Sequence, residues 1–306
     1  MKDIDLNPSD LCNEFARILG STPGVINGVC TATRSRTNLH PVVLGRNADS
    51  FMFVPQAFSF EDIDSDGRGL CLGETVLLQE EVNPFMSKLR EHGIIVTAVH
   101  NHWLFDSPRL MYMHFESIDR PLSFARKVRD AMKVLVTRDV FGKSSFHHDK
   151  DDHRSRNFDF RIRDHHFNES DICDEFNRIL DGEMHTFENE QCIVMKSRLN
   201  IKPEVLGRNG RSFLLIPQMF TFESMTDDGL ALCSGETVIL EEEINPFISK
   251  LRQHGIIVTA VHNHWLFENP RLMFMHWESI DRPLSFARKT RDALSVLTSR
   301  EVRVRR

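Results

Sequence analysis

Hydrophobic and polar residues recur along this chain in two periods, and each period predicts a different kind of element. Apolar residues three to four positions apart indicate helices, and short apolar runs bounded by turn residues indicate strands. In the first half of the chain they predict a helix, a β-rich stretch, and then strand, helix, strand, strand and helix. Ser9 is the expected N-cap of the first helix, and Asn83, before Pro84, is that of the second. The predicted ranges are 9–19, 24–61, 73–78, 84–93, 94–103, 109–117 and 121–132.

The same pattern of elements occurs twice in the sequence. Residues 94–121 read IIVTAVHNHWLFDSPRLMYMHFESIDRP and residues 256–283 read IIVTAVHNHWLFENPRLMFMHWESIDRP, at a constant offset (256 − 94 = 162). This period is far longer than that of a stacking solenoid, so it indicates an internal duplication. We therefore predict two domains, residues 1–140 and 169–306, joined by a polar, His/Asp-rich connector at residues 141–168. Each domain is long enough to bury a core of its own.

The order of the elements indicates the fold class. In the C-terminal half of each repeat the elements run β-α-β-β-α, which is typical of a split, mostly antiparallel sheet with helices packed on one face. The predicted class is therefore α+β, built as a tandem duplicated domain.

Histidines gather in the strand pair of each repeat. Alternate residues of a strand share a face, so His100 and His102 are expected to point the same way, as are His114 and Glu116 on the next strand. An antiparallel hairpin with His100 opposite His114 brings these four side chains to one patch. The second repeat carries the same set as His262, His264, His276 and Glu278.

Imidazoles combined with a carboxylate are a typical ligand set of divalent metals. We therefore predict one zinc or manganese site per repeat, with the two sets above as ligands. A metal held in this way activates water, which indicates hydrolysis of a small substrate if the site is catalytic. Glu74 and Glu236 are candidates for the general base or for a hydrogen-bond partner of a ligand. Arg109 and Arg271 could hold an anionic group of a ligand, or close the turn as surface charges.

Two other functions are compatible with the same residues. One is a non-catalytic module that holds a small anion in a pseudo-twofold cleft between the repeats. The other is a structural or assembly protein whose histidines only pack and hydrogen-bond. The two HNH tripeptides do not indicate a nuclease, because in the ββα-metal nucleases those letters name residues spread over a longer motif. A net charge of −6 also argues against a nucleic-acid partner.

Composition and cysteine usage favour a cytoplasmic protein. Hydrophobic residues make up 41% and charged residues 27%, as in a globular protein that is not a membrane protein. The cysteines show no CxxC spacing and are expected to be reduced and buried; they are Cys12, Cys30, Cys71, Cys173, Cys192 and Cys233. We expect neither a signal peptide nor a membrane span. The expected partner is a small-molecule ligand or substrate, and a homo-oligomer is compatible with the sequence.

The connector carries histidines of its own. Since no regular ligand spacing recurs among them, a solvated connector is favoured over an adventitious metal site. These residues are His147, His148, His153, His165 and His166.

At GETVLLQEEVNPFMSKLREHGIIVTAVHNHWLFDSPRLMYMH, residues 73–114, the chain resembles the LppY/LpqO family of bacterial proteins. The features it shares are an EVNP helix start, a TAxHNH segment and a PRxxxMH segment, in fixed order. The resemblance implies no activity, cofactor or partner, because the family has no established function. Many relatives continue after the third histidine with another histidine and glycines, whereas here Glu116 and Glu278 follow. The resemblance implies that these glutamates replace that histidine or that the site is altered. The tandem arrangement is a second departure from single-domain members.

Overall fold

The computed structural model describes residues 7–143 and 168–303, and it confirms the predicted α+β class. In the first repeat the main elements are α1 (Pro8–Leu19), β1 (Thr22–Ile26), β2 (Val29–Ser35), β6 (Pro55–Glu61), β7 (Gly69–Leu78), α2 (Val82–Glu91), β8 (Ile95–His100), β10 (Leu110–Asp119) and α3 (Pro121–Ala131). The strands form one antiparallel sheet in the order β1-β2-β6-β7-β10-β8. The short strands are β3 (Leu39–His40), β4 (Val42–Val43), β5 (Arg46–Asn47), β9 (Asp106–Ser107) and β11 (Val140–Phe141).

The second repeat copies this arrangement. Its main elements are α4 (Glu169–Leu180), β12 (Met184–Glu188), β13 (Gln191–Ser197), β17 (Pro217–Glu223), β18 (Ala231–Ile239), α5 (Ile244–Gln253), β19 (Ile257–His262), β21 (Met273–Asp281) and α6 (Pro283–Leu294). The sheet order is β12-β13-β17-β18-β21-β19. The short strands are β14 (Ile201–Lys202), β15 (Glu204–Val205), β16 (Arg208–Asn209), β20 (Glu268–Asn269) and β22 (Val302–Arg303).

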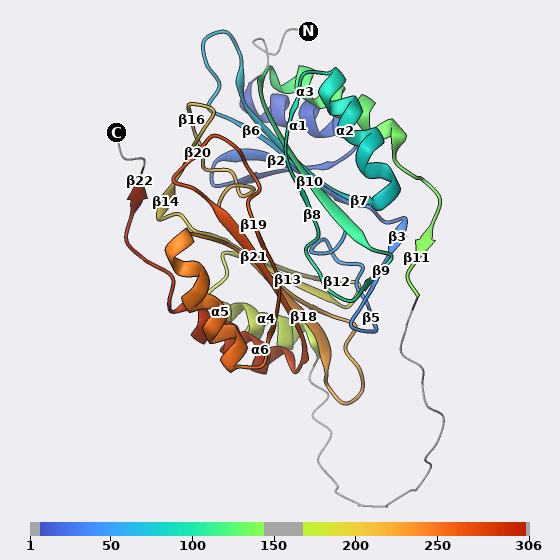
Figure 1. The fold of residues 1–306 in the computed structure, drawn as a ribbon, viewed down its shortest axis with the longest axis vertical. Coiled ribbons are helices and arrows are strands. Elements are labelled where there is room, and N and C mark those ends of the chain that lie inside the picture. Colours follow the sequence, from blue (N-terminus) through green and yellow to red (C-terminus); the bar gives the residue numbers. More distant parts are fainter. Residues whose placement is uncertain (1–6, 144–167, 304–306) are drawn as a thin grey trace, which may run out of the picture.

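The molecule has four layers, with helices outside and the two sheets inside (Figure 1). Each sheet buries one face under its own helices, where aromatic residues such as Phe15, Phe115 and Phe124 form the core of the first repeat. The other faces of the two sheets pack against each other, so residues from both repeats share the inner cores, among them Trp103 and Phe213. Burial of both faces explains why the long strands read as nearly continuous apolar runs.

Reciprocal hydrogen bonds join the two repeats. The Glu61 carboxylate accepts from the backbone N–H groups of Arg211 and Ser212 at 2.7 and 3.0 Å. The equivalent Glu223 accepts from the backbone N–H groups of Asp49 and Ser50, at 2.8 and 3.1 Å. Because each repeat gives the other the same contact, a pseudo-twofold axis relates them.

The helices begin at positions other than those expected. Asn7, rather than Ser9, caps α1, because its side-chain oxygen accepts from the Asp10 backbone N–H at 2.9 Å. The helix α2 begins at Val82, ahead of Asn83, directly after a short 3₁₀ turn at Gln79–Glu81. The Glu81 carboxylate accepts from the Leu78 backbone N–H, which fixes that turn.

A buried ion pair anchors this turn in each repeat. Glu81 pairs with both ends of the Arg36 guanidinium at 2.6 and 2.9 Å, and both side chains are almost fully buried. The second repeat has the same pair, Arg198 and Glu243. The Glu81 carboxylate therefore holds the segment that follows β2, in addition to lying at the N-terminus of α2.

The expectation of reduced cysteines is wrong for four of the six. Disulfides join Cys12 to Cys30 and Cys173 to Cys192. Each ties the first helix of a repeat to the strand that runs beneath it. Cysteines 18 or 19 residues apart carry no recognisable spacing, so only the packing of helix on strand brings them together. The remaining two cysteines, Cys71 and Cys233, are buried.

Among the described residues no helix is both long and apolar enough to pass through a bilayer. The connector histidines at 147, 148, 153, 165 and 166 lie outside the described residues. The domain boundaries at residues 140 and 169 stay predictions.

Candidate metal centre between the repeats

The histidines of the two repeats meet on the pseudo-twofold axis. His100 ends β8, His102 follows in the loop, and His114 lies in the middle of β10. Each imidazole stacks on one from the other repeat. The ring centroids are 3.5 Å apart for His100 and His262, 3.8 Å for His102 and His276, and 3.7 Å for His114 and His264. The six side chains therefore form one cluster across the interface, where the sequence predicted two separate patches.

The predicted strand register is wrong by two residues. His100 pairs with Tyr112, and His114 pairs with Ala98. Both pairs belong to one continuous register, so the error lies in the length of the connection between the two strands, and a β-bulge follows only beyond His114, between His114 and Phe115. A shift of two residues preserves the face of every side chain, so the histidines still converge.

Glu74 lies directly beside the cluster. It stands opposite His114 in the β7–β10 ladder, and Glu236 stands opposite His276 in the second repeat. One potential ligand atom each of Glu74, His102 and His114 lie within 4.8 Å of one another. The same holds for Glu236, His264 and His276. We call these two sets the Glu-His-His triads. Strand alternation alone could not place Glu74 opposite His114, because the two residues are 40 positions apart in the chain (114 − 74 = 40) and their strands pair only in the folded sheet.

A second grouping uses histidines alone. One ring nitrogen each of His100, His102, His262 and His264 also lie within 4.8 Å of one another. This four-histidine set shares His102 and His264 with the triads. Nε2 is the buried, unpartnered nitrogen of both His102 and His264, so a metal in this set would compete for those two atoms with metals in the triads.

The imidazoles of the cluster are held neutral. Burial lowers the pKa of His100 to about 3. Burial also lowers the pKa of His102, and repulsion from neighbouring histidines such as His276 lowers it further. The pKa values of His114, His262, His264 and His276 are lowered for the same two reasons. A neutral imidazole has a free lone pair, which is the form that binds a metal.

The cluster also leaves ring nitrogens without partners. Both nitrogens of His100, His114, His262 and His276, and Nε2 of His102 and His264, are buried with no hydrogen-bond partner among the described residues. Buried polar atoms in folded proteins are nearly always paired, so these nitrogens point to a ligand that the protein itself does not supply.

Glu116 and Glu278 lie outside both groupings. Each is fully buried, on the same strand face as His114 or His276 but one step further along. Glu116 faces the second repeat, where burial and repulsion from Glu268 raise its pKa to about 8. Burial and repulsion from Asp106 do the same for Glu278. Their predicted role as metal ligands stays a prediction, and the structure gives the adjacent carboxylate position to Glu74 and Glu236.

The arginines that were candidates for anion binding close their own loops. Arg109 lies 3.2 Å from the Asp106 carboxylate and donates to the Trp103 carbonyl. Arg271 pairs with Glu268 at 3.0 Å. These contacts favour the turn-closing alternative, and the anion-binding role of Arg109 and Arg271 stays a prediction.

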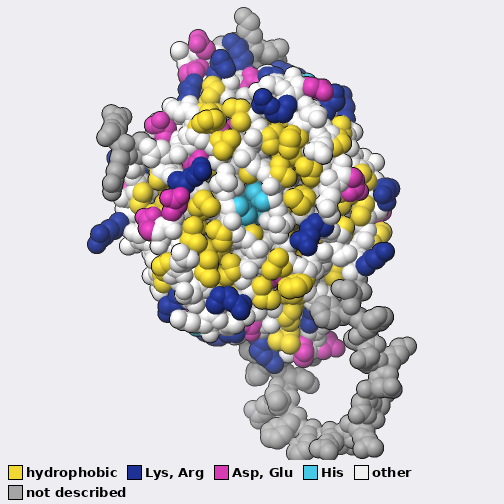
Figure 2. All heavy atoms as spheres, in the orientation of Figure 1, with side chains coloured by type: hydrophobic (Ala, Val, Ile, Leu, Met, Phe, Trp, Pro, Cys, Tyr) yellow, Lys and Arg dark blue, Asp and Glu magenta, His cyan; other side chains and the backbone are white. Residues whose placement is uncertain are grey.

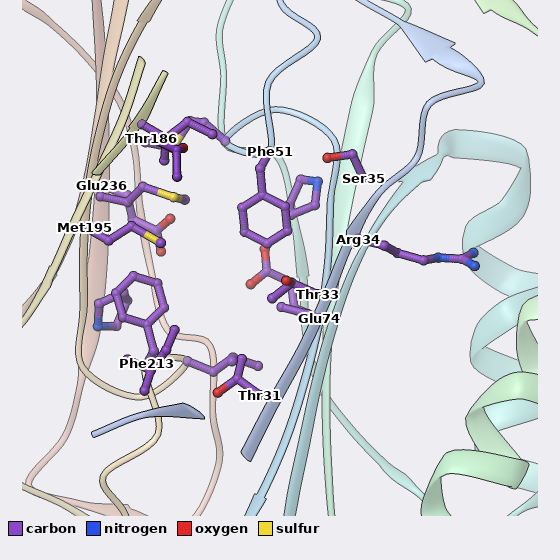
Figure 3. A pocket seen from close by; sticks show the side chains of 18 of the residues that line it. Thr31, Thr33, Arg34, Ser35, Phe51, Glu74, Thr186, Met195, Phe213 and Glu236 are labelled. Carbon is purple, nitrogen blue, oxygen red and sulfur yellow. The ribbon is translucent and has the colours of Figure 1, made fainter. Parts of the chain in front are cut away.

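A cavity of about 450 Å³ lies between the two sheets on the far side of the glutamates. Its walls come from β1, β2, β6 and β7 and from their counterparts, whereas the histidines belong to the half of the interface built by β8 and β10. Glu74 and Glu236 reach it from opposite walls (Figure 3). Burial raises the pKa of Glu74 to about 8, and burial together with repulsion from Glu74 raises the pKa of Glu236.

The opposite end of the cluster reaches the surface. His100 and His262 are partly exposed, whereas His102, His114 and their counterparts are buried. In Figure 2, histidine side chains form a small patch at the centre of one face, with hydrophobic side chains around it. The glutamates thus separate an internal cavity from a histidine cluster that approaches solvent.

Fold and site together define a pseudo-symmetric, two-repeat α+β protein with a buried His/Glu cluster between its sheets. The family model of a domain of unknown function, DUF1259, matches residues 13–134 and again residues 174–296. The chain belongs to this family and carries two copies of its domain. The resemblance to the LppY/LpqO family stays an expectation beside this result.

No curated protein matches the chain. Two solved structures are similar to it at low identity. EtuB from Clostridium kluyveri is 8% identical, over 91% of this chain and 96% of that one, with a TM-score of 0.19. The trimeric bacterial microcompartment shell protein PduB is 9% identical, over 88% and 89%, with the same TM-score. Likeness at this level bears on neither function nor assembly, so the homo-oligomer stays a prediction.

Proposed function

We propose that the protein binds divalent metal ions at the two Glu-His-His triads. The observation that carries this proposal is the set of buried, unpartnered nitrogens on His102, His114, His264 and His276, each beside a glutamate. Two imidazoles and one carboxylate are a set that catalytic zinc uses, with a further position left for water or substrate. The sequence-based expectation of one site per repeat is kept, but Glu74 and Glu236 become ligands.

Charge favours the triads over the four-histidine set. A divalent cation in a buried site needs a nearby negative charge, because an uncompensated charge in a low-dielectric interior is costly. Each triad contains a carboxyl group that can release its proton to bind a cation, whereas His100, His102, His262 and His264 offer only neutral ligands. If a metal occupied the four-histidine set instead, Glu74 and Glu236 would be left for the role of base.

Metal stoichiometry tests the proposal. Protein purified without an affinity tag and dialysed against Zn²⁺ or Mn²⁺ should hold about two ions per chain, as expected for two three-ligand sites. Glu74→Gln should reduce this to about one, and Glu74→Gln with Glu236→Gln to about none, because the amide is a poor ligand for a divalent ion. The matched variant His100→Gln should keep about two ions. About one ion per chain, lost on His100→Gln and kept on Glu74→Gln, would instead establish the four-histidine set.

A hydrolytic activity is the second part of the proposal. The triads lie at the inner end of a cavity large enough for a small substrate. A zinc ion held by Glu74, His102 and His114 would polarise a carbonyl group or a water molecule. Other residues of this chain would orient the substrate and exclude bulk solvent. Hydrolysis of small ester substrates that disappears with chelator and returns with Zn²⁺ would support this part. Metal binding with no such turnover would leave the protein a metal-binding module.

The structure bears on the alternative of a non-catalytic module that binds a small anion between the repeats. A cleft between the repeats is present as the cavity described above, but Arg109 and Arg271 are not among its lining residues. Ligand-induced thermal stabilisation that survives chelator would favour this alternative over the metal-dependent one.

The compartment also belongs to the proposal. The cytoplasmic location expected from the sequence stays a prediction, and two disulfides argue against it. Structural disulfides form and persist in oxidising compartments and are rare in the cytosol. We infer that the protein works in an oxidising environment.

A further inference from the structure

In each repeat, one row of cross-strand neighbours connects the cavity wall to the Glu-His-His triad. In the first repeat, Thr33 pairs with Ala57, Ala57 with Glu74, and Glu74 with His114. Residues paired in this way lie side by side on one sheet face. The row therefore runs from the cavity wall, through the glutamate, to a histidine of the triad.

The second repeat builds the same row from other side chains. Met195 pairs with Met219, Met219 with Glu236, and Glu236 with His276. The inner ends of the two rows are identical, and their outer ends differ. Thr33 and Ala57 on one wall stand where Met195 and Met219 stand on the other.

A third pair of positions in this part of the cavity shows the same difference. Thr31 of the first wall corresponds to Ile193 of the second, and all the positions named here line the cavity. At these three positions the first wall offers two hydroxyl groups and the space beside a small alanine, whereas the second wall carries bulky apolar side chains. The two walls are equivalent segments of the duplicated repeats. At these positions, however, the two sides of the pseudo-symmetric cavity differ chemically.

The charges around the cavity disfavour an anionic occupant. Arg34 is the only lining residue with a cationic side chain. It points away from the cavity in Figure 3, and its guanidinium donates to Gln56 at 2.5 Å. Glu188 stands at the exposed rim, so every lining charge that faces inward or stands at the rim is a carboxyl group. A volume of about 450 Å³ lies within the roughly 300–1,000 Å³ range of small-molecule pockets.

We propose that this cavity binds a small, uncharged organic molecule with one oxygen-bearing edge and one apolar side. The oxygen-bearing edge lies along Thr31 and Thr33, and the apolar side packs on Ile193, Met195 and Met219. Its inner end is presented to Glu74 and Glu236. Only this last step rests on the proposed function, because it places the molecule beside the metal triads.

Probes of one ring size and different charge test the proposal by isothermal titration. We expect 1-naphthol to bind, 1-naphthoate to bind at least about tenfold more weakly, a difference of about 1.4 kcal/mol, and 1-naphthylmethylamine to bind no more tightly than 1-naphthol. Equal or tighter binding of naphthoate would establish an anion site and overturn the proposal, and tighter binding of the amine would establish a cation site. No binding of 1-naphthol or of a second neutral probe, 1-octanol, would also overturn it.

Variants taken from the repeat itself locate the site. Ala57→Met copies the residue that the second repeat carries at 219, so the strand tolerates it, and it fills the cavity. It should weaken 1-naphthol binding by about tenfold or more, the usual result of a steric block in a pocket. Val25→Met is the matched control, because Val25 is exposed and is not among the lining residues. Equal affinity of the two variants would place the probe elsewhere and refute the inference.

The hydroxyl-bearing wall has its own test. Thr33→Val should weaken 1-naphthol by about threefold to tenfold and leave naphthalene unchanged, because only the hydroxyl group of the probe loses a partner. Equal loss for both probes would contradict the two-sided cavity. Metal content measured in the same samples separates the two proposals. Naphthol binding without metal leaves this inference standing and removes the proposed function, and metal binding without naphthol does the reverse.

Discussion

His100 and His262 stack with their ring centroids 3.5 Å apart, although their positions in the chain differ by 162 residues (262 − 100 = 162). Neither repeat alone can form this contact, and the two neighbouring stacks also join one repeat to the other. The duplication therefore did more than copy a site. It placed two copies face to face, so that ligand sets which look separate in the sequence became one cluster.

Two threonines fix the position of this cluster. Thr97 Oγ1 donates to the His264 carbonyl at 2.5 Å, and Thr259 Oγ1 donates to the His102 carbonyl at 2.5 Å. Thr97→Val leaves a buried carbonyl without its donor, so the free energy of unfolding should fall by about 1–3 kcal/mol. Urea denaturation measures this, with Thr37→Val, an exposed threonine, as control. A loss no larger than that of the control would show that the bond does not stabilise the interface.

In this protein the sequence predicts the secondary-structure elements and the strand face of each side chain well. It does not predict which segments pair when they are distant in the chain. Strand alternation places His100 and His114 on one face, and that face survives because the actual register differs by two residues. The sequence made Glu74 a candidate base or hydrogen-bond partner, but its place opposite His114 could not be assigned, since α2 and β8 lie between β7 and β10 in the chain. The stacking of His100 on His262 depends on how the two repeats pack against each other. That packing cannot be predicted from the pattern of residues within either repeat.

Removing only Arg36 from its ion pair with Glu81 should destabilise the protein strongly. Replacing both residues with apolar side chains should destabilise it less than the two single changes added together. Both side chains are almost fully buried, so Arg36→Met alone leaves a buried carboxylate and should cost about 3–5 kcal/mol of unfolding free energy. Arg36→Met combined with Glu81→Leu removes both charges and should cost less than the sum of the two single variants. A double-mutant cycle in urea measures the coupling, and additive losses would contradict it. The equivalent pair of Arg198 and Glu243 should give the same result in the second repeat.

The contact of Glu61 with the second repeat should make stability depend on pH. Burial raises the pKa of Glu61 to about 7, against the hydrogen bonds from the Arg211 and Ser212 backbone and the Arg211 charge, and Asp62 raises it further. Between about pH 4.5 and 7 the unfolded chain has lost this proton while the folded chain keeps it, so stability falls as pH rises through that window.

Glu61→Gln cannot titrate and isolates this effect. From about pH 5 to 8, the free energy of unfolding of the original protein should fall relative to Glu61→Gln by about 2–3 kcal/mol. Glu223→Gln should behave alike, because burial also raises the pKa of Glu223 to about 7. Glu188→Gln, at an exposed position, is the control. A constant difference between Glu61→Gln and the original protein across this range would show that Glu61 is ionised throughout.

The two disulfides give a test of both stability and compartment. Cys12 and Cys30 are separated by 18 residues, and closing a loop of that length stabilises a fold by about 3 kcal/mol. Cys12→Ser with Cys30→Ser should therefore lower the free energy of unfolding by about this amount, and Cys173→Ser with Cys192→Ser should do the same. A variant without these four cysteines should be insensitive to reductant, whereas the original protein should melt at a lower temperature when reductant is added. Thiol titration in denaturant provides the direct check, because protein from an oxidising compartment should expose about two thiols, those of Cys71 and Cys233. Six reactive thiols under those conditions would restore the expectation of reduced cysteines and with it the cytoplasmic location.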